Sequence, residues 1–337
     1  MGRATPSCCA SLAAKTLDRT VDVAGLVAQA RQGSPRAVAR LISLVEDASP
    51  ALREVMATLA PLTGSAYIVG LTGSPGVGKS TMTSAIVKAL RHRGSRVGVL
   101  AVDPSSPFSG GALLGDRVRM QEHTLDPEVY IRSMASRGHL GGLSWSTPQA
   151  LRVLDAAGCD VVLVETVGVG QSEVEVAGLA DTTVVLLAPG MGDGIQAAKA
   201  GILEVGDVFV VNKADRDGAD ATARELRQMI SLGEARAPGD WRPPVVKTVA
   251  SRGEGVDEVM AALDQHLEWL QASGSLRAGR VRRAAAEVEA IALHALRSRI
   301  GDPRRGTALD DVATRVVDGT IDPYAAADVL VEAVTAG

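Results

Sequence analysis

The sequence predicts a doubly wound α/β fold, with a mostly parallel sheet and helical extensions at both ends. Seven short runs rich in Val, Ile and Leu alternate with helical patterns or loops, which is typical of parallel strands joined by helices. Aromatic residues make up only 2% of the chain, so the core must consist mainly of aliphatic side chains. The expected strands are 67–72, 96–103, 128–133, 160–166, 182–189, 207–212 and 244–249.

The order of these patterns divides the 337 residues into four parts. Residues 1–19 have the composition of a disordered leader, and residues 20–62 show apolar positions at helical spacing. Within that extension, Ser34-Pro35 and Ser49-Pro50 are expected to cap and begin helices. The α/β domain is expected over 63–273, and a purely helical tail over 274–337.

The bulk composition excludes several classes of partner. The formal net charge is −4 and no Lys/Arg stripe is present, which argues against nucleic acid. No apolar run approaches the length needed to cross a bilayer, so no membrane association is expected. Three cysteines without metal-ligand spacing are read as reduced thiols, which favours a cytoplasmic location.

A phosphate-binding loop follows the first expected strand. The segment from Gly73 to Ser80 fits the pattern G-x-x-x-x-G-K-[ST], and a helical pattern begins directly after it. Backbone N–H groups of such a loop surround phosphate oxygens, the lysine binds the β- and γ-phosphates, and the serine hydroxyl binds Mg²⁺. The expected phosphate-binding residues are Gly73, Ser74, Pro75, Gly76, Val77, Gly78, Lys79, Ser80 and Thr81.

A second motif selects the base. The sixth expected strand ends in Asn212-Lys213-Ala214-Asp215, an N-K-x-D motif. The Asp215 carboxylate can accept both N1–H and the amino hydrogen of guanine, whereas adenine lacks that donor pair. Asn212 is expected to tie this loop to the P-loop, and the Lys213 stem to cover the base. After the last strand, Val249, Ala250 and Ser251 are expected to contact guanine, with the Ala250 N–H on O6.

Two acidic residues end strands at the edge where ligands bind in open α/β sheets. Asp103 and Glu165 are therefore expected to hold Mg²⁺ and its waters, although a helix N-cap is the alternative for each. Asp116, in a glycine-rich segment, could orient water or magnesium. Gly168 is expected to bind the γ-phosphate through its N–H, so that hydrolysis would release the segment after Glu165.

The loop at 189–201 carries Asp193, Gln196 and Lys199. An ordinary surface loop is one interpretation of this segment. Lysine usage favours a role for it, since only six of the 35 basic residues are lysine. Three of those six are Lys79, Lys199 and Lys213, where an ammonium group on a slim stem suits phosphate or base contacts better than a guanidinium.

Together these motifs resemble the MeaB/ArgK/MMAA family of G-proteins, which are GTPase chaperones of adenosylcobalamin-dependent acyl-CoA mutases, chiefly methylmalonyl-CoA mutase. The resemblance runs from about residue 20 to the C-terminus and is most specific at 103–120 and 165–173. It implies a SIMIBI-class P-loop domain, GTP or GDP with Mg²⁺ as cofactors, and a homodimer formed through residues 274–337. It also implies that Ser80, Asp103, Asp116 and Glu165 hold magnesium and that Lys199 assists hydrolysis.

The chain departs from the family pattern at two places. Val249-Ala250 replaces Ser-Ala in the guanine loop, and Arg117-Val118 stands where Lys-Thr is frequent. Three alternatives to the mutase chaperone are considered. A metal-inserting GTPase normally carries a His-rich tract or a Cys-containing metal motif, which this chain lacks. The N-K-x-D motif counts against a transport-linked ATPase or kinase, and the intact Lys79 and Ser80 against a non-enzymatic scaffold.

Overall fold

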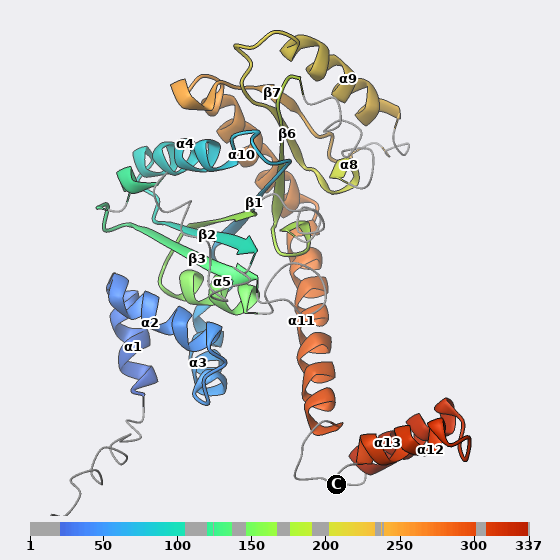
Figure 1. Cartoon of the computed structure of the whole chain (residues 1–337). Coiled ribbons are helices and arrows are strands. Elements are labelled where there is room, and N and C mark those ends of the chain that lie inside the picture. The colour runs from blue at the N-terminus through green and yellow to red at the C-terminus, as the bar shows by residue number, and fades with distance from the viewer. Residues whose placement is uncertain are drawn as a thin grey trace, which may run out of the picture.

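Seven parallel strands form the centre of the protein in the computed structural model (Figure 1). The structure describes residues 21–104, 120–123, 125–136, 146–166, 176–190, 202–232, 237, 239–300 and 308–335. The strand order is β3-β2-β4-β1-β5-β6-β7, and each of the paired strands runs parallel to its neighbours. The predicted doubly wound α/β fold is confirmed. The strands are β1 Tyr67–Thr72, β2 Val97–Pro104, β3 Val129–Ser136, β4 Val161–Thr166, β5 Thr182–Leu187, β6 Val208–Val211 and β7 Val245–Lys247.

Alternate side chains of the central strands fill two apolar layers. On one face, Val69 and Leu71 of β1 pack with α4 (Lys79–His92) and α10 (Val256–Ala272). The opposite face is covered by α5 (Thr147–Ala156) and the 3-10 turn η3 (Val176–Gly178). Two helices, α8 (Ile202–Val205) and α9 (Ala219–Leu232), complete that face beside β5 and β6. Two further 3-10 turns are η2 (Gln121–His123) and η4 (Ala250–Arg252).

The N-terminal extension is helical, as the apolar spacing predicts, and it shares the core of the sheet. It consists of α1 (Val23–Arg31), α2 (Pro35–Glu46), α3 (Leu52–Leu59) and the turn η1 (Ala60–Leu62). Their apolar faces pack with α5 in one buried cluster, which includes Leu41, Ile42, Val45, Val55, Leu59, Leu151 and Leu154.

One of the two predicted helix starts is wrong. Ser34 caps α2 by accepting from the Ala37 N–H at 3.4 Å, with Pro35 in the first turn, as predicted. Ser49 and Pro50 instead form a turn, and α3 begins only at Leu52. The reason is local, because the Ser49 hydroxyl and carbonyl accept from the N–H groups of Ala51 and Leu52 before the helix starts.

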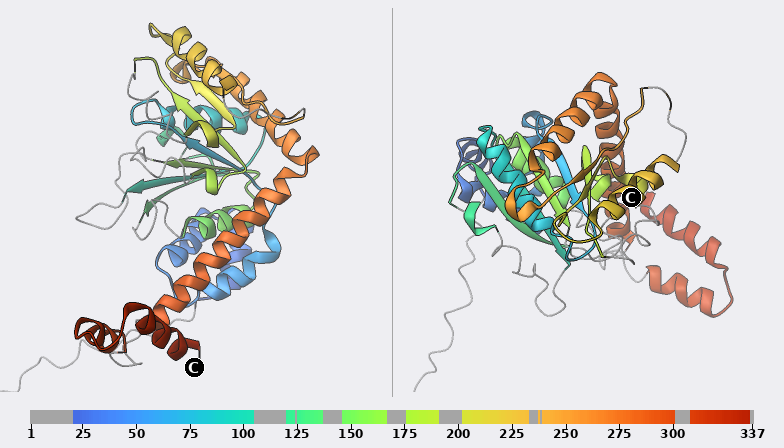
Figure 2. Two further views of the ribbon diagram at one scale, coloured as in Figure 1. Left: turned by 90° about the vertical axis from the view of Figure 1, so that its right-hand side faces the viewer. Right: turned by 90° about the horizontal axis from the view of Figure 1, so that it is seen from above.

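Where the structure describes the C-terminal part, its regular elements are all helices. Helix α11 (Ser275–Ile300) leaves the base of the sheet and runs away from it, carrying α12 (Ala308–Val317) and α13 (Pro323–Thr335) at its far end (Figures 1 and 2). A break at Ser273-Gly274, with Gly274 at φ 75°, separates α11 from α10. None of the described helices is both long and apolar enough to span a bilayer.

A buried polar network lies between β5, β6 and α10. The Thr182 hydroxyl contacts both the Tyr67 hydroxyl and His266 Nδ1, the latter at 2.7 Å, and His266 Nε2 lies 3.5 Å from Asp207 Oδ1. Burial raises the pKa of Asp207 from 3.8 to about 6, although the Thr183 N–H opposes this by donating to its carboxylate. Burial also lowers the pKa of His266 from 6.5 to about 4. Both pKa shifts therefore go in the direction of the neutral form.

We predict that Asp207→Asn becomes relatively more stable as pH rises from 4 to 7. In the wild-type chain the folded state holds the Asp207 proton to higher pH than the unfolded state, so stability falls as pH rises through that window. Asparagine has no such proton and keeps an acceptor for the Thr183 N–H. The measurement is the difference in melting temperature between variant and wild type at several pH values. Asp217→Asn, at an exposed position, is the matched control. A difference for Asp207→Asn that does not change with pH would contradict the prediction.

Candidate nucleotide site

The parallel sheet gathers the predicted motifs at one edge. Leu71 of β1 pairs with Glu165 of β4, which in turn pairs with Ala101 of β2, so these strands end side by side. The loop after β1 is the P-loop, and β1 lies where the strand order changes direction, which is where open α/β sheets bind ligands.

Close backbone approach explains two of the P-loop glycines. A Cβ on Gly73 would lie 2.2 Å from the Leu186 carbonyl oxygen, and one on Gly78 would lie 2.4 Å from Asn212 Nδ2. Both glycines also have positive φ, 139° and 98°. No side chain forms a capping hydrogen bond at the N-terminus of α4, and a helix N-terminus directly after a glycine-rich loop is suited to bind an anion. The backbone of the P-loop and the start of α4 together therefore form a site that suits a chain of phosphates.

The lysine of the loop is buried and lies across it. Lys79 Nζ donates to the carbonyl oxygens of Gly73 at 2.5 Å and Ser74 at 3.2 Å. Only 7% of the residue is exposed. The ammonium group therefore stands over the same backbone segment that would surround the phosphates.

Ser80 and Glu165 meet, as the sequence predicts. The Ser80 hydroxyl donates to Glu165 Oε1 at 2.6 Å, and the carboxylate is 1% exposed. The sequence analysis missed Thr83, whose hydroxyl lies 2.9 Å from Glu165 Oε2 and 3.0 Å from the Lys79 carbonyl. Its position one helical turn after Ser80 is the signal that could have revealed it. A hydroxyl and a carboxylate beside a phosphate cradle are a chemically suitable donor set for Mg²⁺, which keeps most of its waters.

The described part of the structure does not show the other predicted magnesium-binding and switch residues together. The backbone places Asp103 near the end of β2, paired with Ala135 of β3. Asp116, Gly168 and Lys199 lie outside the described residues. Among the residues that are described, no group of three or more His, Cys, Asp and Glu side chains could hold a metal ion.

Asn212 joins the base-binding loops to the P-loop, as predicted. Its Nδ2 donates to the Val77 carbonyl at 2.9 Å. Its Oδ1 accepts from the Thr248 hydroxyl and from the Ala250 N–H, both at 3.1 Å. The Ala250 N–H, which we expect on guanine O6, thus donates to Asn212 in this structure, and its contact with guanine stays a prediction.

Lys213 and Asp215 border a small pocket beside these loops. Lys213 has a positive φ of 58° and donates from Nζ to the Gly76 carbonyl at 2.6 Å, which draws its stem over the P-loop. Asp215 lies 3.4 Å from Arg252 Nη2, a contact that the sequence analysis did not anticipate. The pocket has a volume of about 170 Å³ and is lined by Gly78, Thr81, Asn212, Lys213, Asp215, Arg216, Val249 and Ser251.

The fold and this site define a P-loop GTPase. The sequence model of the methylmalonyl-CoA mutase-associated GTPase MeaB matches residues 38–303, and the chain belongs to that family. A putative GTPase of Pyrococcus abyssi is 48% identical over 93% of this chain and 97% of its own length. The mouse mitochondrial methylmalonic aciduria type A homolog is 42% identical over 65% of this chain and 53% of its own. The crystal structure of a LAO/AO transport system kinase has a TM-score of 0.69, with 28% identity over 92% of this chain and 96% of that one.

We predict that Gly78→Ala weakens GTP binding by at least about tenfold, or about 1.4 kcal/mol. The added Cβ would displace Asn212 and with it the contact between the phosphate and base loops. Gly94→Ala is the matched control, because Gly94 has a similar φ of 82° but open space around its Cβ. Calorimetric titration with GTP measures both variants, and equal affinities would contradict the clash as the cause.

Asp215→Asn should lower GTP affinity and shift preference towards xanthosine triphosphate. The amide presents a donor where guanine needs an acceptor, and xanthine carries a carbonyl oxygen at that edge. Competition between the two nucleotides for the purified variant measures the shift. Asp217→Asn, two residues further on, serves as control, and an unchanged guanine preference of Asp215→Asn would remove Asp215 from the site.

Proposed function

We propose that this GTPase is a magnesium-dependent chaperone of an adenosylcobalamin-dependent acyl-CoA mutase, with methylmalonyl-CoA mutase as the favoured client. In this role it gates cofactor loading and protects or reactivates the mutase. The observation that carries the proposal is the match of residues 38–303 to a family described by its association with methylmalonyl-CoA mutase. The buried contact between Ser80 and Glu165 supports the nucleotide chemistry.

The residues of this chain would divide the chemistry as follows. The P-loop amides and Lys79 bind and orient the phosphates, while Asn212 and Asp215 select guanine. Ser80 and Glu165 would hold Mg²⁺, with Asp103 and Asp116 as its further proposed partners. When bound, the ion neutralises charge that develops on the phosphates.

Hydrolysis is proposed to act as a timer rather than as a rapid turnover reaction. Gly168 would sense the γ-phosphate, and Lys199 would assist hydrolysis in the assembled complex. Because a catalytic group supplied on assembly can complete a GTPase site, the free protein should turn over slowly.

We further propose that residues 274–337 form a homodimer. Several apolar side chains of α11 stand in solvent, including Val281, Val288 and Ile291, which fall at helical spacing. Val288, for example, is 65% exposed. If a second copy of this helical arm packed against α11, these apolar side chains would be shielded from water.

Two alternative functions can be distinguished from the proposed one by ligand binding. A metal-inserting GTPase would bind a transition ion tightly, yet the five histidines of this chain are scattered and no C-x-x-C is present. A transport-linked ATPase or kinase would prefer ATP, which the predicted role of Asp215 opposes. Parallel titrations with GTP, ATP and Ni²⁺ separate these functions.

We predict that purified mutase accelerates GTP turnover by at least about tenfold, as trans-acting groups do in other GTPases. Phosphate release is measured with and without the mutase, in magnesium buffer. Lys79→Ala should stay slow in both conditions, which shows that the accelerated activity belongs to this site. No acceleration by any adenosylcobalamin-dependent acyl-CoA mutase would defeat the chaperone proposal while leaving the GTPase assignment intact.

A further inference from the structure

A fully buried carboxylate lies at the base of the sheet, on the far side from the nucleotide site. Asp181 directly precedes β5, and its side chain is 0% exposed. It accepts from the Ile68 N–H at 3.1 Å, and its own N–H donates to the Ile68 carbonyl at 2.7 Å. Asp181 is thus held on both sides by the backbone of β1.

Two arginines of α11 converge on this carboxylate. Arg280 donates to Asp181 from Nε at 3.1 Å and from Nη2 at 2.7 Å, and Arg283 donates to Asp181 Oδ1. The same guanidinium groups bind main-chain carbonyls, Arg280 at Gly64 and Ala66, and Arg283 at Ala180. Charge-assisted and bidentate contacts of this kind are strong and strict in geometry. The base of α11 is therefore anchored to the start of β1 and to the residue before Asp181.

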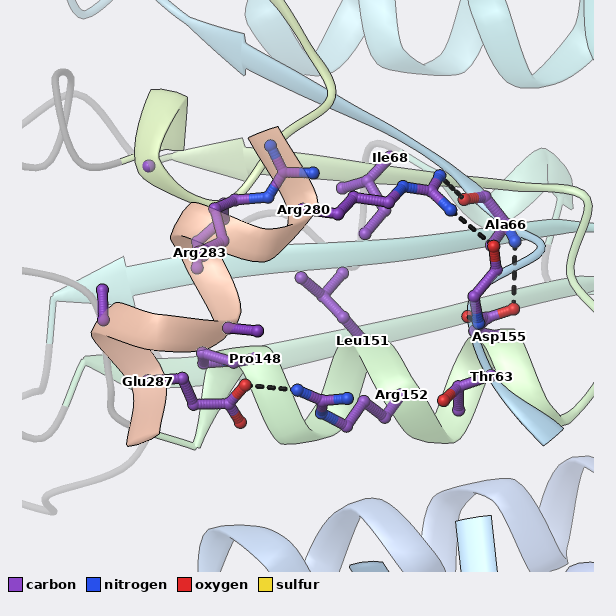
Figure 3. Close-up of a pocket in the computed structure, with 15 residues that line it drawn as sticks. Thr63, Ala66, Ile68, Pro148, Leu151, Arg152, Asp155, Arg280, Arg283 and Glu287 are labelled. Atoms are coloured by element: carbon purple, nitrogen blue, oxygen red, sulfur yellow. Dashed lines mark hydrogen bonds and ion pairs between the residues drawn. The ribbon is translucent and has the colours of Figure 1, made fainter. Parts of the chain in front are cut away.

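Beside this cluster, α11 does not close-pack against the domain. A pocket of about 450 Å³ separates it from α5 and η3, with Ile68, Leu151 and Leu179 among its apolar lining (Figure 3). One further ion pair crosses the pocket, from Arg152 of α5 to Glu287 of α11. The hydrogen bonds and ion pairs between α11 and the domain at this junction come from Arg280, Arg283 and Glu287.

The anchor is also connected to the nucleotide site. Residues 176–181 follow the segment that starts after Glu165 and Thr166, and η3 rests directly on β1. A Cβ on Gly70 would lie 2.3 Å from Val176 Cγ1 and 3.0 Å from the Ala180 Cβ. Gly70 is three residues before Gly73 of the P-loop. The Ala180 N–H also donates to the Val176 carbonyl at 3.0 Å, so Ala180 is tied to η3 while Asp181 is tied to β1.

We propose that Asp181, Arg280 and Arg283, with the pair Arg152–Glu287, form a polar latch that transmits the nucleotide state to the orientation of α11. The latch rests on the proposed function, because it requires GTP and GDP to place the segment after Glu165 differently. In one nucleotide state the five side chains hold α11 as seen here. In the other, movement of η3 shifts the Ala180 carbonyl that accepts from Arg283, and α11 turns over the pocket about the fixed Asp181. Two discrete arrangements of one element, biased by the nucleotide, are what such coupling requires.

The test is hydrogen–deuterium exchange of the full chain, comparing GDP with a non-hydrolysable GTP analogue in magnesium buffer. Peptides from 276–290 report the base of α11. The wild-type chain should exchange differently in the two states, whereas Arg283→Ala and Glu287→Arg should lose the difference and still bind the analogue with wild-type affinity. Arg152→Glu combined with Glu287→Arg restores the ion pair and should restore the difference. Arg282→Ala is the matched control, because Arg282 is exposed on the same helix.

The outcomes separate this inference from the proposed function. Binding of the analogue without any nucleotide-dependent change in 276–290 would overturn the latch alone. So would a Glu287→Arg chain that keeps the wild-type difference. A wild-type chain that does not bind the analogue would overturn both. If Arg283→Ala does not fold, the single and double exchanges at Arg152 and Glu287 decide the question.

Discussion

The contact between Asn212 and the P-loop backbone is the constraint on which the nucleotide site depends. Asn212 follows β6, whereas the P-loop follows β1, and β5 lies between these strands. The side chain spans that distance because Gly78 has no Cβ, which leaves room for Nδ2 beside it. One amide group then satisfies the Val77 carbonyl, the Thr248 hydroxyl and the Ala250 N–H together. The phosphate cradle and the base pocket therefore form one unit.

This arrangement makes recognition of the base and of the phosphates interdependent. A buried amide whose donor and acceptor are both used is costly to disturb, since a partner left unsatisfied in the interior loses its full hydration. Loss of the contact at one end therefore affects the other. The buried Glu165, held by Ser80 and Thr83, attaches the end of β4 to the same helix. The start of α4 thus meets the end of β4, and the Asn212 contact joins the loop after β6 to the loop after β1.

At the opposite end of the sheet, a different kind of contact joins the domain to helix α11. There the domain meets α11 through ion pairs beside a pocket. Contacts of this kind have strict geometry, and a carboxylate as buried as Asp181 is costly to leave without its arginines. The two ends of the sheet are thus held by different kinds of contact, loop-to-loop hydrogen bonds at one and ion pairs to a helix at the other.

The sequence by itself determined the strands, their parallel arrangement, the helical extensions and the identity of both nucleotide motifs. These features are local, because strand and helix periodicity and the spacing G-x-x-x-x-G-K-S or N-K-x-D can be read within a few residues. The position of Glu165 at the same edge as the P-loop also followed from strand ends that must share an edge. Helix α3 shows the limit of local patterns, since the Ser49-Pro50 turn delayed its start to Leu52. Only the tertiary structure decided that Arg252 meets Asp215 and that Asp181 gathers Arg280 and Arg283. Partners about a hundred residues apart leave no spacing in the sequence, because their contact depends on how the completed sheet and helices pack.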